Sequence, residues 1–169
     1  MPSWTRLPSA PWARGKKTGP NPTDRRKPGS KHHLLTDARG VILAVLLTSA
    51  SCHDVTQLLP LVDAIPPVRG RIGRPRQRPE KLLADRAYDS EPHRKALRAR
   101  GIEPVIAKRR TPHGSGLGKQ RCVIERTISH LHRPRRLRTR FDPADFIHEA
   151  FLKIGCILNA WRALKSSFC

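Results

Sequence analysis

Two isolated carboxylates stand out in a strongly basic chain. Glu125 is the single acidic residue between Glu103 and Asp142, and this stretch also holds eleven Lys and Arg residues. Asp85 ends the short apolar segment L-L-A at residues 82–84. A carboxylate repels a nucleic-acid backbone unless a divalent cation lies between them. The pattern therefore predicts metal-assisted chemistry on such a backbone.

The net charge indicates the same partner. The chain carries 34 Lys and Arg residues against 13 Asp and Glu residues, a formal net charge of +21. Solubility alone requires a net charge of only roughly 2–8 in a small domain. Each phosphate that a basic side chain neutralises releases a condensed counterion, which favours binding to nucleic acid. Aromatic residues make up only 5% of the chain, which disfavours base-stacking platforms for single strands.

The remaining composition indicates one domain in a reducing cytosol. A chain of 169 residues is long enough for one hydrophobic core. The longest apolar run, residues 41–47, is too short to span a bilayer, and we see no secretory signal. The cysteines form no C-x-x-C pair, so we expect free thiols and no structural zinc. They are Cys52, Cys122, Cys156 and Cys169.

The elements that must position the two acids follow from periodicity. Residues 31–36 and 41–48 flank a Gly-containing turn and predict a hairpin, whose apolar second arm we expect to be a central, buried strand. Short strands are predicted at 81–84 and 103–107, with helices over 55–64, 91–100, 121–133 and 143–164. This order predicts an α/β fold with a mixed sheet flanked by helices. Ligands of such sheets gather at the carboxyl ends of strands, where Asp85 lies.

The last predicted helix carries a long apolar stripe. Its residues recur at helical spacing, so we expect them to face the core. They are Phe146, Ile147, Ala150, Phe151, Ile154, Ile157, Leu158 and Trp161.

Each of the two acids has a structural alternative. Asp85 either caps a turn after its strand or ligates Mg²⁺, which takes one or two carboxylates and keeps most of its waters. Glu125 either pairs locally with Arg121 or Arg126, or turns towards the sheet near Asp85. Asp89, four residues after Asp85, is expected to be a cap or turn acid for the next helix.

His53 and Asp54 present a further choice. They are either an acid/base pair or the ordinary start of a helix that Asp54 caps. The other histidines lack a metal-ligand spacing, and His130 and His132 are expected to join the basic surface beside Arg133.

Three basic clusters, at residues 69–78, 108–110 and 133–140, are the expected phosphate-binding surfaces for a nucleic acid. We assign DNA contact to Arg69, Arg71, Arg74, Arg76, Lys108, Arg109, Arg110, Arg121, Arg133, Arg135 and Arg136.

Several motifs, in order, resemble insertion-sequence transposases of the IS5 type, within the IS4 superfamily. They are T-G-P-N-P-T-D-R at 18–25, G-S-K at 29–31, L-L-A-D-R-A-Y-D-S at 82–90, V-I-E-R-T at 123–127 and L-H-R-P-R-R-L at 131–137. The similarity covers about residues 16–163. The resemblance implies an RNase H-like fold and a DDE active site with two divalent metal ions, Mg²⁺ or Mn²⁺.

Carried over by motif, Asp85 would be the second acid of the triad and Glu125 the final one, each a catalytic residue and a metal ligand. The family surrounds its Glu with a Y-R-E-K-like signature. Arg121 matches the Arg, whereas Gly118 stands where Tyr is expected and His132 stands near the Lys.

The opening of the chain departs from the family. The resemblance places the first Asp on an opening strand shortly before the T-G-P-N motif, but residues 1–14 contain no acid. Their prolines break any element that begins there, so we predict an irregular, non-family segment at 1–15. Residues 16–165 would then be a truncated RNase H-like domain whose opening strand is missing. The opening has the character of an unrelated reading frame.

The predicted function is DNA cleavage and strand transfer at insertion-sequence ends by a two-metal mechanism. Without one metal-bridging carboxylate, this chain alone is expected to be nearly inactive. The alternatives are a non-catalytic DNA-binding regulator, which occupies ends or associates with itself or with intact transposase, and a degenerate remnant.

Overall fold

The computed structural model describes residues 2–8, 15–22, 25–69, 73–109 and 118–165. The side chains of residues 2–8 and 118–121 lie outside this description. The predicted positions Arg71 and Arg110 also lie outside it.

The main sheet is built around β3 (Pro28–Thr36). On one side it pairs antiparallel with β1 (Pro2–Pro8), from Pro2 opposite Leu35 to Pro8 opposite Gly29. On the other side lies β4 (Ile42–Ser49), which completes the predicted hairpin. The two-residue strand β2 (Gly19–Pro20) pairs with the beginning of β3. Every residue of β3 after Pro28 is buried, so this strand is the centre of the sheet.

A second, parallel pair of strands positions Asp85. The strand β5 (Lys81–Ala84) pairs with β6 (Glu103–Ile106), and β1 lies beside β5. Between them run the 3-10 turn η2 (Arg86–Tyr88) and the helix α2 (Glu91–Ala99). Ser90 occupies the N-cap of α2, and Gly101 follows the helix with a φ of +74°. A left-handed residue after a helix is the usual site of glycine, because other side chains adopt that backbone at a cost.

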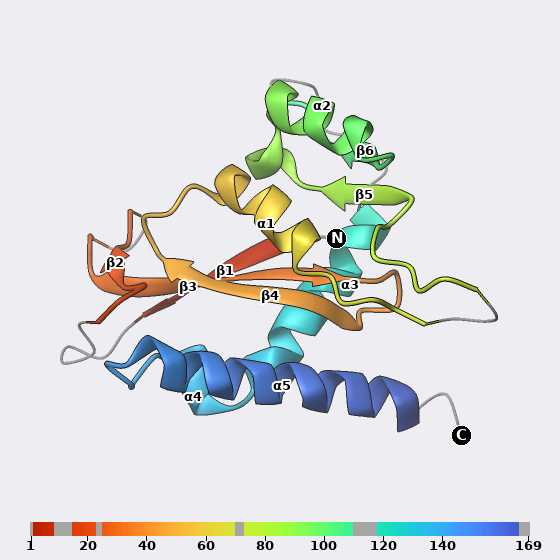
Figure 1. Ribbon diagram of the computed structural model, residues 1–169. Coiled ribbons are helices and arrows are strands. Elements are labelled where there is room, and N and C mark those ends of the chain that lie inside the picture. The colour runs from red at the N-terminus through yellow and green to blue at the C-terminus, as the bar shows by residue number, and fades with distance from the viewer. Residues whose placement is uncertain (1, 9–14, 23–24, 70–72, 110–117, 166–169) are drawn as a thin grey trace.

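Helices cover the sheet in layers (Figure 1). The turn η1 (Asp54–Gln57) and α1 (Leu58–Asp63) lie between the main sheet and the β5–β6 unit. The helices α3 (Gly118–Leu131), α4 (Arg135–Arg138) and α5 (Asp145–Lys165) follow, and α5 runs along the lower side of the sheet in this view.

The two faces of β3 feed two apolar cores. Leu35 packs with α1, α2 and the β5–β6 strands, whereas Leu34 packs with residues of α3, α4 and α5. Successive side chains of a strand point to opposite faces, so neighbouring leucines enter different cores. The second core is tight at Gly155 of α5, where a Cβ atom would lie 2.7 Å from Leu137 Cδ1.

The structure corrects several expectations. The opening strand is present, since residues 2–8 form β1 despite their prolines. The prediction of a central, buried second arm for the hairpin is wrong, because β4 pairs only with β3 among the described strands. The predicted helix over 55–64 divides into η1 and α1, and α4 was not predicted. The expected strands at β5 and β6 and the expected helices α2, α3 and α5 are confirmed.

The apolar stripe of α5 is the largest correction. Only part of it faces the core: Phe151 packs against the lower cluster. Phe146, Ile157 and Trp161 are each at least 66% exposed, and Ile154 is 52% exposed. The core-facing side of α5 is instead carried by Leu152 and His148, both fully buried.

Candidate functional site

Asp85 lies directly after β5, at the carboxyl end of the strand. Its backbone is extended, and its Oδ1 accepts a hydrogen bond of 2.8 Å from the Ala87 backbone N–H. The capping role that the sequence left open for Asp85 is therefore present. A cap occupies one oxygen of a half-buried carboxylate, and a carboxylate has further lone pairs for a second ligand.

A guanidinium group is held against the same turn. Arg109 Nε donates to the Arg86 carbonyl at 3.1 Å, and its Nη2 donates to the Ala87 carbonyl at 3.3 Å. The backbone N–H of Arg109 donates to Asp89 Oδ2 at 2.8 Å. Of the predicted phosphate-binding residues, Arg109 is thus the one that these contacts fix beside Asp85.

Asp89 organises the base of this turn and does not cap α2, whose N-cap is Ser90. Its Oδ1 accepts two hydrogen bonds from the buried Arg94, which also donates to the Ile106 carbonyl at 2.8 Å. The Arg109 backbone N–H, assisted by Arg94, lowers the pKa of Asp89. The sequence analysis did not identify Arg94. The signal that it offered was an arginine on the face of α2 that turns towards the core.

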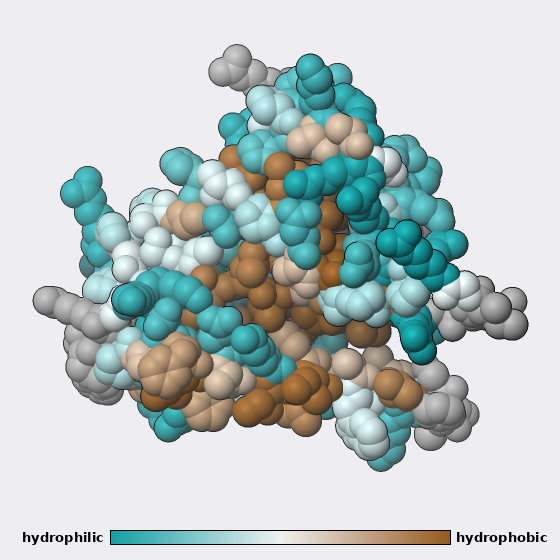
Figure 2. Space-filling model, in the orientation of Figure 1, coloured by the Kyte–Doolittle hydropathy of each residue, from teal (hydrophilic) through white to brown (hydrophobic). Residues whose placement is uncertain are grey.

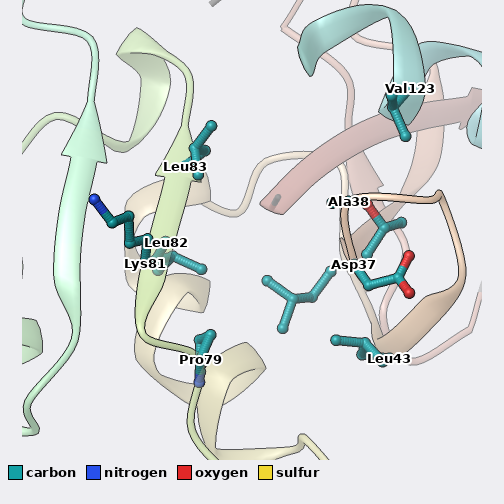
Figure 3. Close-up of a pocket in the computed structure, with 10 residues that line it drawn as sticks. Asp37, Ala38, Leu43, Pro79, Lys81, Leu82, Leu83 and Val123 are labelled. Atoms are coloured by element: carbon teal, nitrogen blue, oxygen red, sulfur yellow. The ribbon is translucent and has the colours of Figure 1, made fainter.

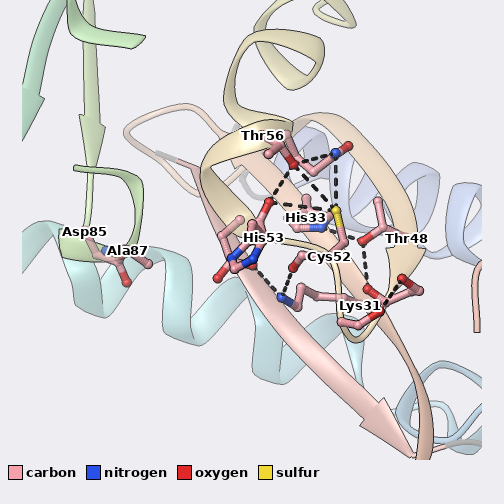
Figure 4. A network of polar contacts seen from close by, with 12 residues as sticks. Lys31, His33, Thr48, Cys52, His53, Thr56, Asp85 and Ala87 are labelled. Atoms are coloured by element: carbon pink, nitrogen blue, oxygen red, sulfur yellow. Dashed lines mark hydrogen bonds and ion pairs between the residues drawn. The ribbon is translucent and has the colours of Figure 1, made fainter. Parts of the chain in front are cut away.

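A buried ion pair joins β3 to the start of η1 (Figure 4). Lys31 of β3 is 1% exposed, and its Nζ donates to Asp54 Oδ1 at 2.7 Å and to the Cys52 carbonyl at 2.6 Å. Asp54 is therefore a partner of Lys31, and the N-cap of η1 is His53. Burial, with smaller effects from Asp54 and then Asp85, raises the pKa of the buried Tyr88 hydroxyl.

Asp54, Tyr88 and Asp85 therefore lie in one neighbourhood, where η1 meets η2. The Tyr88 hydroxyl has no hydrogen-bond partner among the described residues. The acid/base pairing of His53 with Asp54 gains no support, because the Asp54 carboxylate is engaged by the Lys31 ammonium.

Glu125 lies on α3 with its side chain exposed. The helix is fixed by its neighbours: Ile124 is buried, and Thr127 Oγ1 donates to the Gly40 carbonyl at 3.1 Å. These contacts join α3 to the turn of the β3–β4 hairpin. The convergence of Glu125 on Asp85 stays a prediction.

The basic residues predicted to bind DNA are exposed wherever their side chains are described. Arg135 stacks over Phe141, and Arg136 lies 4.7 Å from the Phe151 ring centre and pairs with Asp142. Arg76 pairs with Glu80 on the surface. The other exposed members are Arg69, Arg74, Lys108 and Arg133, while the Arg121 side chain lies outside the described residues.

A pocket of about 350 Å³ lies away from Asp85 (Figure 3). It is lined by Lys81, Leu82 and Leu83 of β5, by Asp37 of the hairpin turn, and by Val123 of α3. Its walls are mainly apolar side chains on the amino-terminal side of β5. The pocket is therefore not the place where a strand-end carboxylate would act.

Three imidazoles form a polar cluster between the sheet and the last helices. His32 of β3 is fully buried, with its Nδ1 3.3 Å from His132 Nε2 and its Nε2 3.0 Å from His148 Nε2. The two contacts use opposite nitrogens of His32, so the three rings do not chelate one ion. His132 therefore faces inward, and its expected place on the basic surface is wrong.

These histidines make stability depend on pH. Burial, together with the nearby Arg140, lowers the pKa of His148 to about 4, and burial lowers the pKa of His32 as well. The same groups titrate near 6.5 when the chain is unfolded. Between these values the unfolded chain binds more protons, so stability falls as the pH falls from about 6.5 towards 4.

We expect chemical denaturation at a series of pH values to show this loss, and His148→Gln to reduce the slope in that window. A substitution of the exposed His53 serves as the control and should leave the slope unchanged. A wild-type free energy of unfolding that is flat between pH 6.5 and 4 would contradict the expectation.

Residues 5–160 match the family of transposase DDE domains. The chain belongs to this family. A relative from Burkholderia cepacia, named as a transposase for insertion sequence element IS402, is 66% identical over 154 residues, which are 91% of this chain and 72% of the relative. The transposase for insertion sequence element IS1106 from Neisseria meningitidis serogroup B is 28% identical over 117 residues, 63% of this chain and 37% of that protein. No solved structure matches.

The predicted resemblance to DDE insertion-sequence transposases is thereby confirmed. Transposases of the DDE family use divalent metal ions. Among the described residues of this DDE domain, no three His, Cys, Asp or Glu side chains gather in an arrangement that would hold a metal ion. In the same part of the chain, no helix combines the length and apolar character of a membrane span.

Proposed function

We propose that this chain is the catalytic part of an insertion-sequence transposase, in a form that lacks the first acid of its active site. Asp85 carries the proposal, because a DDE domain requires an acid at the end of this strand and the chain has one there. Arg109 supports it by holding a cation against the same turn, where a DNA phosphate would need one. In this assignment, Glu125 is the final acid. The expected setting is the bacterial cytoplasm, at the nucleoid.

The strand arrangement supports an RNase H-like fold for residues 16–165, with β1 added to it. Three antiparallel strands, β4, β3 and β1, are followed by the parallel pair β5 and β6, and β1 lies beside β5. Helices flank this arrangement (Figure 1). In such a fold the first and second acids stand on neighbouring strands, which here are β1 and β5. The assignment of residues 1–15 as a segment from outside the family stays a prediction.

The codons of β1 indicate that the preceding reading frame encodes the missing acid. Trp has the single codon TGG, and every Thr codon begins with AC. Read from one nucleotide upstream, the codons of Trp4 and Thr5 therefore give NTG-GAC, which encodes Leu, Met or Val followed by Asp. An aspartate on the opening strand is what the resemblance to the family implies. The preceding frame thus encodes an Asp at the β1 position of Thr5, which pairs with His32 of β3.

The basic residues of this chain have two tasks, which are to bind the duplex and to hold a phosphate near Asp85. The exposed basic side chains bind and orient the duplex, and Arg109 is pre-positioned for a phosphate near Asp85. In the intact family site, divalent metal ions supply Lewis acidity at the phosphate. With Asp85 and Glu125 alone, the acids of this chain do not fit a two-metal site. We therefore assign DNA binding, and no cleavage, to the chain as it stands.

A second candidate function follows from that difference. A protein that keeps the basic surface and lacks the first acid would occupy insertion-sequence ends without cutting them, alone or together with intact transposase. The acid-free opening favours this regulatory reading for the present chain. A degenerate remnant of a transposase would have the same DNA-binding chemistry, and it would differ from a regulator only in having no role in the cell.

Duplex binding tests the proposal directly. We expect the chain to bind double-stranded DNA, with a logarithmic association constant that falls linearly with the logarithm of salt concentration. Lys108→Gln and Arg133→Gln are each expected to lower that slope by about 0.9, the value for one phosphate contact. Arg98→Gln on α2 removes an equal charge from a position outside the predicted clusters, and serves as the control. Binding that ignores salt, or equal effects of all three changes, would contradict the assignment.

A further inference from the structure

The outer face of α5 carries an apolar seam with a regular spacing. Six exposed positions follow each other at intervals of three, four, three, four and three residues, the a/d pattern of a helix that packs on another helix. We call these positions the α5 seam: Ile147, Ala150, Ile154, Ile157, Trp161 and Leu164. Apart from Ala150, their exposed fractions run from 37% to 66%.

The seam is opposite to the face that α5 uses within its own chain. Leu152 and His148 are buried against the sheet and the neighbouring helices. Figure 2 shows hydrophobic side chains gathered along α5, at the lower edge of the molecule. A helix with apolar residues on both faces is normally covered on both sides. The expected DNA partner does not suit the seam, because phosphates would meet apolar side chains there.

We propose that the α5 seam binds the α5 seam of a second copy of this chain, with the two helices antiparallel about a two-fold axis. In an interface with two-fold symmetry, a residue that contacts a second residue of the other copy is itself contacted by that second residue from its own copy's side, so every contact occurs twice. The seam has this property, because residue numbers in facing layers add to one constant. The layers are Ile147 with Leu164, Ala150 with Trp161, and Ile154 with Ile157, each occurring twice.

The sizes of the facing side chains support the same arrangement. Trp161, the largest residue of the seam, lies opposite Ala150, the smallest. Alternation of large and small residues across an interface lets two helices approach without voids. In a parallel pair, each Trp161 would instead meet the other Trp161, and each Ala150 would face the other Ala150.

The charges of α5 also select the antiparallel direction. The first turn of the helix is acidic, with Asp145, and the last turn is basic, with Arg162 and Lys165. An antiparallel pair places each acidic start beside the basic end of the other copy, and it opposes the two helix dipoles favourably. A parallel pair would bring the basic ends of two strongly cationic chains together.

Sedimentation of the full chain, without DNA or metal, tests the interface. We expect the wild-type chain to form a dimer that salt strengthens by screening its net charge. Ile157→Glu is expected to weaken the association constant by at least about 100-fold, since it buries a charge at the centre of the seam. Ala99→Glu, at an exposed position of α2, adds the same charge elsewhere and should leave association unchanged. Circular dichroism checks that both variants stay folded.

Cysteine pairing tests the direction of the helices. In a background with Cys122→Ser and Cys169→Ser, a mixture of Ala150→Cys chains and Trp161→Cys chains should cross-link under mild oxidation. Either variant by itself should remain uncross-linked, whereas a parallel pair would cross-link each variant with itself.

Three results would overturn the inference. They are a monomeric wild-type chain, a dimer that Ile157→Glu leaves intact, and a seam that binds lipid vesicles while the chain stays monomeric. The inference is independent of the proposed function, because a chain that dimerises without binding DNA, or binds DNA as a monomer, separates the two.

Discussion

A chain whose opening segment is read from the preceding frame is expected to nick DNA at least about 10³-fold faster than the chain as it stands. The frame change places an Asp at the β1 position of residue 5, beside the strand that ends at Asp85. A third carboxylate supplies the charge that holds divalent ions against a phosphate, which two acids in a cationic surface do not. The measurement is Mg²⁺- or Mn²⁺-dependent nicking of a supercoiled plasmid that carries the element with both ends.

Matched variants separate the acid from the other changes in that segment. The frame-corrected chain with Asn in place of the new Asp keeps the same opening and should lose the gain. Asp85→Asn and Glu125→Gln in the frame-corrected chain should each remove it as well. Nicking by the chain as it stands, or a folded and DNA-binding corrected chain that does not nick, would contradict the proposed site. A nucleotide sequence whose preceding frame is interrupted by stop codons before residue 4 would contradict the origin that we propose for the opening.

The elements closest to Asp85 were predictable because short-range signals agree there. The apolar run of β5 ends at a polar residue, Gly101 stops α2, and β6 follows at once, so period and turn residues point to one answer. The β3–β4 hairpin has the same consistency, with Gly40 at a φ of +91° in its turn. These signals fixed the strand end that carries the proposed second acid.

The opening strand was missed because its support comes from another strand. Three prolines of the first eleven residues argue against a strand, yet Pro2 and Pro8 stand at the two ends of β1. A proline costs least at the end of an element, where a missing N–H leaves fewer hydrogen bonds unmade. Pairing along β3 then decides the conformation, and this is a tertiary effect that no local pattern contains.

The polar centre of the sheet was missed for a related reason. Lys31, His32 and His33 occur consecutively in the first arm of the predicted hairpin, and nothing in their spacing indicates that all three are buried. They are tolerated because residues far along the chain satisfy them: Asp54 for Lys31, and His148 for His32. The prediction for α5 was wrong in the opposite direction, because apolar side chains expected in the core are exposed. Periodicity locates an apolar stripe on a helix, but it does not state what covers that stripe.

Asp54→Ala is expected to lower the free energy of unfolding by roughly 3–5 kcal/mol, the usual effect of removing one partner from a buried ion pair. The Lys31 ammonium is 1% exposed and would remain in the centre of the sheet without its carboxylate. For a chain of this size the midpoint of thermal unfolding should fall by roughly 10 °C. Urea denaturation followed by circular dichroism measures the change in the free energy of unfolding. The turn at Asp85 should be destabilised together with η1, because η1 contacts η2.

Two further variants show whether burial is the cause. Glu80→Ala breaks the ion pair with Arg76, whose side chains are 79% and 80% exposed, and it should cost less than about 1 kcal/mol. The double variant Lys31→Met with Asp54→Leu removes both buried charges and should recover most of the loss, because neither partner is then left desolvated. If Asp54→Ala costs no more than Glu80→Ala, the pair does not hold η1 to the sheet. The position of the Asp85 turn must then depend on the contacts of Asp89 with Arg94 and Arg109.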